Sequence, residues 1–272
     1  MTLNVVDLGR IGYLDAMRLQ EEYAGQIATG QRPPTLLLLE HPHVYTFGRR
    51  GHAANLLLGE RALKDRGIEV HWVDRGGDIT YHGPGQLVGY PLLPLKSLAP
   101  RPSVEDRIAA GDEAASTASL DSDRIPRADY VGYLRKLEQT IIVTLYAMGI
   151  AAAQRPGMTG VWVQPRVWAR CRRCRPEDLG KPAKIASIGV KLDAHGVSRH
   201  GFALNVNPEM TYWDGIVPCG LAEQPVAAVA DFLDPVPSMA SVKLMLVDAF
   251  SGVFSSSPTR DWRSRTSIDF SS

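Results

Sequence analysis

The sequence predicts a mixed α/β protein, and three observations support this. Residues 35–40 contain four consecutive leucines and residues 68–73 alternate apolar and polar side chains, as buried and half-buried strands do. Residues 13–27 and 130–148 repeat their apolar side chains at helical spacing. Residues 184–192 and 201–207 are extended segments that flank a glycine-containing turn, which predicts a β-hairpin.

Further elements follow the same rules of periodicity. An opening strand is predicted over residues 3–8, and helices are predicted over 221–233 and 238–254. His41 and His43 lie beside two arginines and are candidate metal ligands, but no carboxylate or cysteine spacing completes such a site. The preferred interpretation is a strand end that faces solvent.

The segment Arg75–Pro91 concentrates five glycines and two prolines between two predicted strands. Gly76-Gly77 and Gly83-Pro84-Gly85 permit positive φ and close approach of a ligand to the backbone. We interpret the segment as a tight connection that forms the wall of a substrate pocket, with a histidine, His82, near the reacting atoms. The alternative is a structural double turn in which the histidine is satisfied by other protein groups.

Two polar segments interrupt the apolar pattern. Residues 97–128 and 164–183 supply few large apolar side chains, and both are predicted to be mobile insertions. The sequence therefore predicts one catalytic domain over residues 1–255, with these two insertions and a disordered serine-rich tail at 256–272.

Composition narrows the classes of partner and compartment. Thirty basic and 29 acidic residues give a formal net charge of +1, which argues against a nucleic-acid or membrane partner. The first ten residues do not resemble a secretory signal and no stretch of about 20 apolar residues exists, so a cytoplasmic protein is expected. Three cysteines argue against a disulfide framework and for reduced thiols.

Cys219 and Lys184 form a candidate nucleophile and base. Cys219 lies between a proline and a glycine at the start of a predicted helix, where the helix dipole favours a thiolate. If the hairpin pairs Leu192 with His200, Lys184 lies roughly opposite Pro208, and the chain can return Cys219 to it. The alternative is that the cysteine is a small core residue and the lysine is solvated.

Five segments occur here in the order typical of the octanoyltransferases of lipoate biosynthesis, which this sequence resembles: 75–91, 156–163, 184–189, 204–208 and 215–220. The resemblance implies a mostly antiparallel sheet flanked by helices, similar to the catalytic domains of biotin and lipoate protein ligases. It also implies transfer of an octanoyl group from the phosphopantetheine of acyl carrier protein, without another cofactor or a metal. The acceptors would be lipoyl domains of 2-oxoacid dehydrogenase acyltransferase subunits and the glycine cleavage H protein.

The resemblance also implies roles for individual residues. Cys219 matches the nucleophile that forms the acyl thioester, and Lys184 matches the lysine that lowers the pKa of that thiol. His82 would either orient the carbonyl or pass a proton to or from the attacking amine. The implied substrate-binding residues are Arg75, Gly76, Gly77, Asp78, Ile79, Thr80, Tyr81, His82, Ser187, Ile188, Gly189, Gly201, Phe202 and Ala203.

The segment 164–183 departs from the family pattern. It contains Cys171-Arg-Arg-Cys174, for which two free thiols are preferred over a structural zinc site. Its arginines, at positions 166, 170, 172, 173 and 175, could attract an acidic carrier protein or lipoyl domain, or could simply be solvated. The rival function is an ATP-dependent lipoate or biotin protein ligase on the same fold, which would not need Cys219.

Overall fold

An eight-stranded sheet forms the centre of the computed structural model, which describes residues 2–95, 129–168, 170–174, 176–178, 180–218, 224–255 and 257–261. The strand order is β11-β1-β2-β6-β10-β9-β8-β7. β1 pairs parallel with β2 and with β11, whereas all neighbours from β2 to β7 pair antiparallel. The strands are β1 (Thr2–Arg10), β2 (Thr35–Glu40), β6 (Gln86–Leu92), β7 (Ala152–Arg155), β8 (Met158–Val163), β9 (Ala183–Leu192), β10 (Ser198–Asn205) and β11 (Ser257–Asp261).

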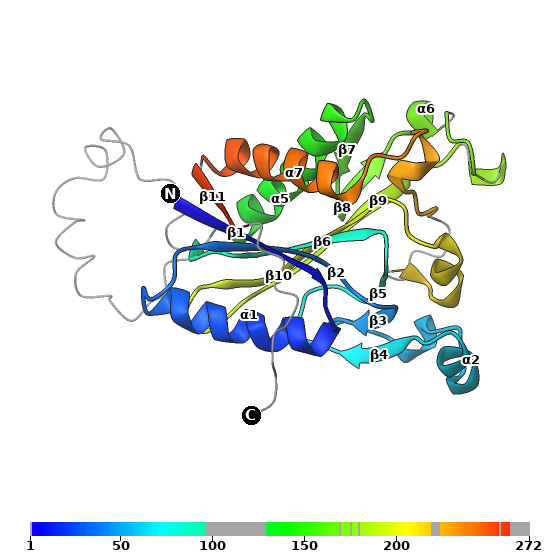
Figure 1. The fold of residues 1–272 in the computed structure, drawn as a ribbon. Coiled ribbons are helices and arrows are strands. Elements are labelled where there is room, and N and C mark those ends of the chain that lie inside the picture. Colours follow the sequence, from blue (N-terminus) through cyan, green and yellow to red (C-terminus); the bar gives the residue numbers. More distant parts are fainter. Residues whose placement is uncertain are drawn as a thin grey trace, which may run out of the picture.

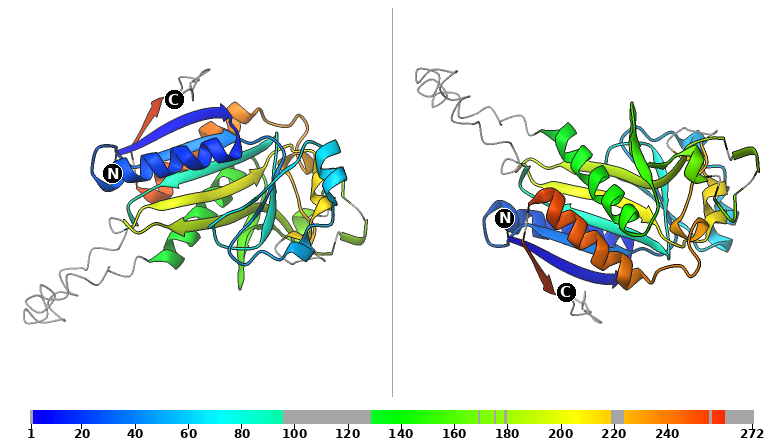
Figure 2. Two further views of the ribbon diagram at one scale, coloured as in Figure 1. Left: turned by 90° about the horizontal axis from the view of Figure 1, so that it is seen from below. Right: turned by 90° about the horizontal axis from the view of Figure 1, so that it is seen from above.

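Helices cover both faces of this sheet (Figures 1 and 2). α1 (Tyr13–Ala28) lies on one face, and α5 (Tyr130–Ala147) and α7 (Met239–Phe254) lie on the other. The four consecutive leucines of strand β2 fill the cores on both faces of the sheet. Leu36 and Leu38 pack in the core under α5 and α7, while Leu37 and Leu39 pack under α1, because successive side chains of a strand point to opposite faces.

A second, three-stranded sheet has the order β4-β3-β5. Strand β3 (Val44–Phe47) pairs parallel with β4 (Glu69–Trp72) and antiparallel with β5 (Ile79–His82). The segment after β4 was predicted to be only a tight connection, but it contains the strand β5. The shorter elements around this sheet are the helix α2 (Glu60–Asp65) and the 3-10 turns η1 (Ala53–Asn55) and η5 (Met210–Gly215).

The predicted hairpin is present as β9 and β10, but its register differs from the prediction. Ser198 lies opposite Leu192, and His200 lies opposite Val190. The prediction paired Leu192 with His200, which is a shift of two residues. Because side chains alternate with a period of two, this shift leaves the same side chains on the same face of the sheet.

The segment 164–183 packs against the core where it is described, in contrast to the predicted mobile insertion. It contains the short helix α6 (Pro165–Trp168) and the 3-10 turn η4 (Pro176–Asp178), and Val167, Cys171 and Cys174 contact the main core. Cys171 and Cys174 form a disulfide, so the predictions of free thiols and of a zinc site are both wrong for this pair. The first predicted insertion, 97–128, lies outside the described residues.

Two predictions near the C-terminus are also corrected. Val226 forms an isolated β-bridge with Lys184 and Val229–Asp231 form a 3-10 turn, η7, so the described part of the predicted helix 221–233 is not an α-helix. Ser257–Asp261 form β11 beside β1, although the tail from 256 onward was predicted to be disordered. Among the described residues, no helix is long and apolar enough to cross a membrane.

Candidate active site

Three of the predicted segments meet in one pocket, where the small sheet adjoins β9 and β10. Thr80 and His82 reach it from β5, Lys184 and residues 187–189 from β9, and residues 201–203 from β10. Arg75, Gly76 and Gly77 close it from the loop between β4 and β5. Its remaining lining residues are Tyr90, which belongs to the predicted pocket-wall segment 75–91, and Tyr13 and His200, which the sequence did not indicate.

Three residues of the predicted substrate-binding set do not line this pocket. Ile79 and Tyr81 alternate with Thr80 and His82 along β5 and pack in the core of the small sheet. The carboxylate of Asp78 accepts hydrogen bonds from the backbone N–H groups of His52 and Ile79, at 3.1 and 2.7 Å. Asp78 therefore holds the loop in place instead of facing the pocket.

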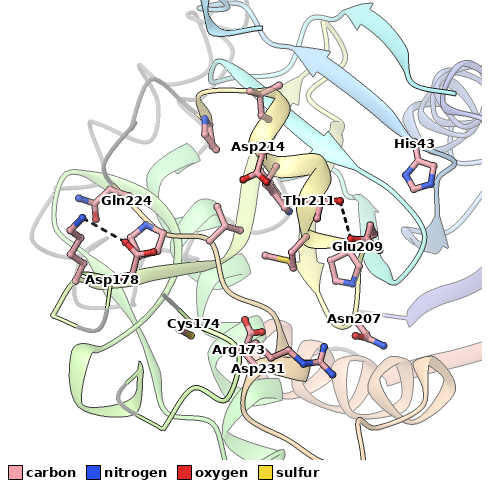
Figure 3. A pocket seen from close by; sticks show the side chains of 18 of the residues that line it. His43, Arg173, Cys174, Asp178, Asn207, Glu209, Thr211, Asp214, Gln224 and Asp231 are labelled. Atoms are coloured by element: carbon pink, nitrogen blue, oxygen red, sulfur yellow. Dashed lines mark hydrogen bonds and ion pairs between the residues drawn. The ribbon is translucent and has the colours of Figure 1, made fainter. Parts of the chain in front are cut away.

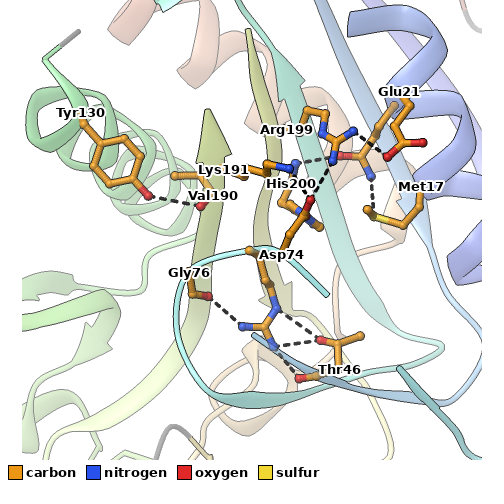
Figure 4. Close-up of polar contacts among 12 residues, drawn as sticks. Met17, Glu21, Thr46, Asp74, Gly76, Tyr130, Val190, Lys191, Arg199 and His200 are labelled. Atoms are coloured by element: carbon orange, nitrogen blue, oxygen red, sulfur yellow. Dashed lines mark hydrogen bonds and ion pairs between the residues drawn. The ribbon is translucent and has the colours of Figure 1, made fainter. Parts of the chain in front are cut away.

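Small residues allow the loop 75–77 to lie directly on β9. Gly77 has a φ of +88°, and a Cβ added to Gly189 would lie 3.0 Å from the carbonyl oxygen of Gly76. The buried guanidinium of Arg75 donates to Oγ1 of Thr46 and to the carbonyl oxygen of Gly76 (Figure 4). Arg75 thus braces the loop against strand β3.

Asp74 ties the same loop to β9 and β10 through a cluster that the sequence analysis missed (Figure 4). Its carboxylate accepts hydrogen bonds from His200 Nε2 at 2.8 Å and Arg199 Nη2 at 3.1 Å, and it forms an ion pair with Lys191. The hydrogen bond from His200 holds the pKa of Asp74 well below its usual range. His200, which the sequence analysis considered only as the hairpin partner of Leu192, is buried in the pocket wall.

His82 is a buried, neutral histidine. Its Nδ1 lies 2.7 Å from Oε1 of Gln86, whose amide nitrogen donates to Asn205 Oδ1 at 2.9 Å. The Gln86 oxygen is therefore the acceptor, which assigns the proton of His82 to Nδ1 and leaves Nε2 unprotonated. Burial, followed by the charge of neighbouring His41, lowers the pKa of His82 to about 3.

The sequence predicted that His41 lies at a strand end that faces solvent, but His41 is completely buried. It donates from Nδ1 to the carbonyl oxygen of Ile11 and contacts the hydroxyl of Tyr90 through Nε2, at 2.9 and 2.8 Å. Burial lowers its pKa to about 4. His43 is half-buried and pairs with the hydroxyl of Tyr81 at 2.9 Å.

Lys184 lies at an irregularity of the sheet that faces the pocket. Val161 pairs with Ala186 but Trp162 pairs with Lys184, so β9 carries one extra residue there, as in a β-bulge. The buried side chain of Lys184 places Nζ 5.5 Å from the centroid of the Trp162 ring. A Cβ on Gly160 would lie 2.7 Å from Lys184 Cε, so the space for the lysine depends on that glycine.

Cys219 lies outside the described residues, together with residues 220–223, but both ends of this segment are described. On one side, Val217 donates its N–H to the carbonyl oxygen of Asn55 at 2.8 Å. On the other, Lys184 donates its N–H to the carbonyl oxygen of Pro225 at 2.8 Å and forms a bridge with Val226. The chain that follows Cys219 therefore returns to the backbone of Lys184.

Pro218 and Gln224, the residues that flank the segment 219–223, line a second, larger groove (Figure 3). This groove does not include Lys184 among its lining residues, but it includes Pro225 and Val226. Because residues 224–228 are not helical, a helix dipole at Cys219 is no longer supported by the neighbouring structure. No group of three or more histidine, cysteine or acidic side chains in the described ranges could hold a metal ion.

Comparison with known proteins identifies the family. The lipoyl protein ligase A/B catalytic domain matches residues 12–118 and 115–251. An octanoyltransferase of Solibacter usitatus is 42% identical over 223 residues, which cover 82% of this chain and 80% of the relative. An octanoyltransferase of Chloroflexus aggregans is 35% identical over 257 residues, which cover 94% and 97%. The chain belongs to the octanoyltransferase family.

Solved structures of lipoate protein ligases have the same fold as this member of the octanoyltransferase family. A lipoate-protein ligase A bound with ATP has a TM-score of 0.63 at 16% identity, with 96% of this chain and 89% of that chain covered. A lipoate protein ligase from Thermoplasma acidophilum has a TM-score of 0.60 at 17% identity, with 96% and 86% covered. The fold is therefore that of the lipoate protein ligases, as the resemblance implied.

Proposed function

We propose that this protein transfers an octanoyl group from acyl carrier protein to a lysine of lipoyl domains, through a thioester on Cys219, in the cytoplasm. The acceptors would be lipoyl domains of 2-oxoacid dehydrogenase acyltransferase subunits and the glycine cleavage H protein. Membership of the octanoyltransferase family supports the reaction. The observation that carries the covalent mechanism is the pairing of Lys184 with Val226, which returns the chain after Cys219 to the lysine beside the pocket.

The first half-reaction acylates the enzyme. Lys184 accepts the proton of the Cys219 thiol, and the thiolate attacks the thioester carbonyl of the carrier. Backbone N–H groups of the loop 75–78, other than that of Gly76, which donates to Val190, are the candidate donors to the oxyanion. When the intermediate collapses, the C–S bond to the carrier breaks, its phosphopantetheine thiolate takes up a proton and leaves, and Cys219 holds the acyl group.

The second half-reaction transfers the acyl group to the acceptor. The neutral amine of the acceptor lysine attacks the Cys219 thioester, loses a proton, and releases the Cys219 thiolate as the amide forms. The low pKa of His82 keeps it a neutral imidazole whose unprotonated Nε2 can accept a hydrogen bond from the attacking amine and so orient it, because Nδ1 already donates to Gln86. The same low pKa makes His82 a weak base, so orienting the amine is favoured over accepting its proton. In both half-reactions the acyl donor is a thioester, which is already activated, so no ATP is needed.

The pocket suits an acyl chain that ends in a polar carbonyl. Its walls combine the flat or apolar side chains of Tyr13, Ile188 and Phe202 with Gly189 and Gly201, where the loop 75–77 and strand β6 pack too closely for a side chain. Thr80 Oγ1 is buried in this wall and has no hydrogen-bond partner among the described residues, so it can donate to a polar ligand atom.

Intact-mass analysis after mixing with octanoyl-acyl carrier protein tests the proposal. We expect an octanoyl adduct on the wild type that hydroxylamine removes, no adduct on Cys219→Ser, and slow formation on Lys184→Ala. The double variant Cys171→Ser/Cys174→Ser is the control and should still be acylated. If no variant forms an adduct and labelling of a lipoyl domain requires ATP, the ligase alternative replaces this proposal.

A further inference from the structure

A groove bordered by α5 lies beside the pocket and leads to Lys184. Its volume is about 880 Å³, within the range of about 300–1,000 Å³ usual for small-molecule sites. Its floor is β9, where the carbonyl oxygen of Val190 accepts hydrogen bonds from Tyr130 Oη and from the N–H of Gly76, each at 3.2 Å (Figure 4). The groove and the pocket share Gly76, Gly77, Lys184, Ile188 and Gly189.

The rim of this groove is positively charged. Arg50 lines it, and the backbone N–H groups of Arg49 and Arg50 donate to the carbonyl oxygens of Arg75 and Gly77, each at 3.0 Å, so both arginines follow the loop that borders the groove. Both side chains are exposed. Asp78 is the one carboxylate among the described lining residues, and its oxygens already accept hydrogen bonds from residues of its own loop and of η1. Asp129, at the start of α5, caps that helix through Gly132.

The larger groove beside Pro218 has the opposite character (Figure 3). Asp178, Glu209, Asp214 and Asp231 line it, against the two cations Arg173 and Lys181. Lys181 is paired with Asp178 at 3.6 Å. An acidic protein is therefore repelled by this groove and attracted by the rim that carries Arg49 and Arg50.

We propose that acyl carrier protein docks on the rim formed by Arg49 and Arg50 and extends its phosphopantetheine arm along the α5 groove to Lys184. The arm carries a phosphate, and an acidic carrier complements two exposed arginines at consecutive positions. Tyr130, which lines the groove from α5 and is 38% exposed, offers an apolar contact on the same side. This inference rests on the proposed function and adds to it the side from which the donor approaches.

The proposal replaces the sequence-based hypothesis that arginines 166–175 attract the carrier. Arg172 is paired with Asp234 at 3.0 Å, and Arg173 lines the acidic groove. Arg166 and Arg170 are exposed on the same segment and provide a matched pair for comparison with Arg49 and Arg50.

Charge reversal with two donor substrates tests the proposal. Arg49→Glu/Arg50→Glu and, as the control, Arg166→Glu/Arg170→Glu are assayed with octanoyl-acyl carrier protein and with octanoyl-pantetheine, which has no carrier. For the rim variant we expect KM for the carrier substrate to rise about tenfold or more while kcat/KM for octanoyl-pantetheine changes by less than about twofold. The control should change neither value.

Salt dependence and a milder variant complete the test. In the wild type, KM for octanoyl-acyl carrier protein should rise with NaCl, and this rise should be weaker in Arg49→Gln/Arg50→Gln, a variant that removes charge without adding repulsion. An unchanged carrier KM in both rim variants, an equal loss on both donors, or a carrier-specific loss in the control would overturn the docking site. Failure of the wild type to be acylated by either donor would instead refute the proposed function.

Discussion

Arg155 donates a hydrogen bond from Nη1 to Oε1 of Gln224 at 2.6 Å, which joins strand β7 to the residue that follows segment 219–223. The same guanidinium lies 5.2 Å from the centroid of the Trp162 ring, the ring that Lys184 also contacts. The β7–β8 hairpin therefore touches both Lys184 and the end of the segment that contains Cys219. A hairpin in this position can hold the two proposed catalytic groups in register.

Arg155→Met should slow acylation of Cys219 by about tenfold or more, because a loosely held nucleophile loses its productive geometry. The measurement is the single-turnover rate of adduct formation together with the pH profile of iodoacetamide labelling at Cys219. Arg155→Met/Gln224→Ala should be no slower than the worse single variant, and the exposed Arg166→Met is the control. Strictly additive effects of the two substitutions would argue against a direct link.

Gly160→Ala should lower the acylation rate by more than its loss of folding stability explains. The added Cβ would lie 2.7 Å from both Lys184 Cε and the carbonyl oxygen of Ala186, at a φ of +125°. Gly157→Ala is a matched control, since its φ is +74° but no atom lies within 4 Å of the added Cβ. We expect Gly157→Ala to lose about 1–2 kcal/mol of unfolding free energy from backbone strain, and Gly160→Ala to lose more because its Cβ also meets a backbone oxygen. Only Gly160→Ala should lower the acylation rate. Equal rates in the two variants would show that Lys184 does not depend on Gly160.

Asp74→Asn should weaken the loop that closes the pocket. The substitution removes the negative charge that Arg199, His200 and Lys191 share, while its size is unchanged. Since Asp74 is 41% exposed, solvent screens part of the loss, and a decrease of about 1–2 kcal/mol in unfolding free energy is expected. Because the folded pKa is depressed, the wild type has this stabilisation above about pH 4 and loses it below. Urea unfolding at pH 7 and pH 3 should therefore show a smaller difference between the two proteins at pH 3.

Two buried histidines should make stability fall as the pH decreases. The pKa values of His41 and His82 are lowered to about 4 and about 3, whereas the unfolded value is about 6.5, so the unfolded chain binds more protons between these values. Their contribution is complete above about pH 6.5 and decreases by up to about 1.4 kcal/mol per pH unit for each histidine below it.

The slope of unfolding free energy against pH tests this linkage. His41→Gln can keep both hydrogen bonds of His41 without titrating. The number of protons bound on unfolding between pH 6 and pH 5, which the slope of unfolding free energy against pH gives, should therefore be smaller by about one in this variant. The exposed His195→Gln is the control. An unchanged slope for His41→Gln would contradict the burial of a neutral imidazole at this position.

The sequence by itself determined the elements whose cause is local. Four leucines in residues 36–39 require a strand buried on both faces, and apolar spacing predicted α1, α5 and α7 to within about two residues. The glycines at 77 and 85 adopt positive φ, as their chain context indicated. The motif order also identified the family, because long motifs retain their residues when the rest of a chain diverges.

Only the tertiary structure decided which of these elements meet. Asp74 and His200 are 126 residues apart, and Arg155 and Gln224 are 69 apart, so no local periodicity reports either contact. The pairing of Val226 with Lys184 holds residues 225–227 alongside β9 where helical spacing was expected, because backbone hydrogen bonds to Lys184 outweigh a weak local preference. The burial of His41 likewise follows from packing between distant strands, which a one-dimensional pattern does not encode. The register of the β9–β10 hairpin is set by its turn, where the Asp193 carboxylate accepts hydrogen bonds from the N–H groups of His195 and Val197.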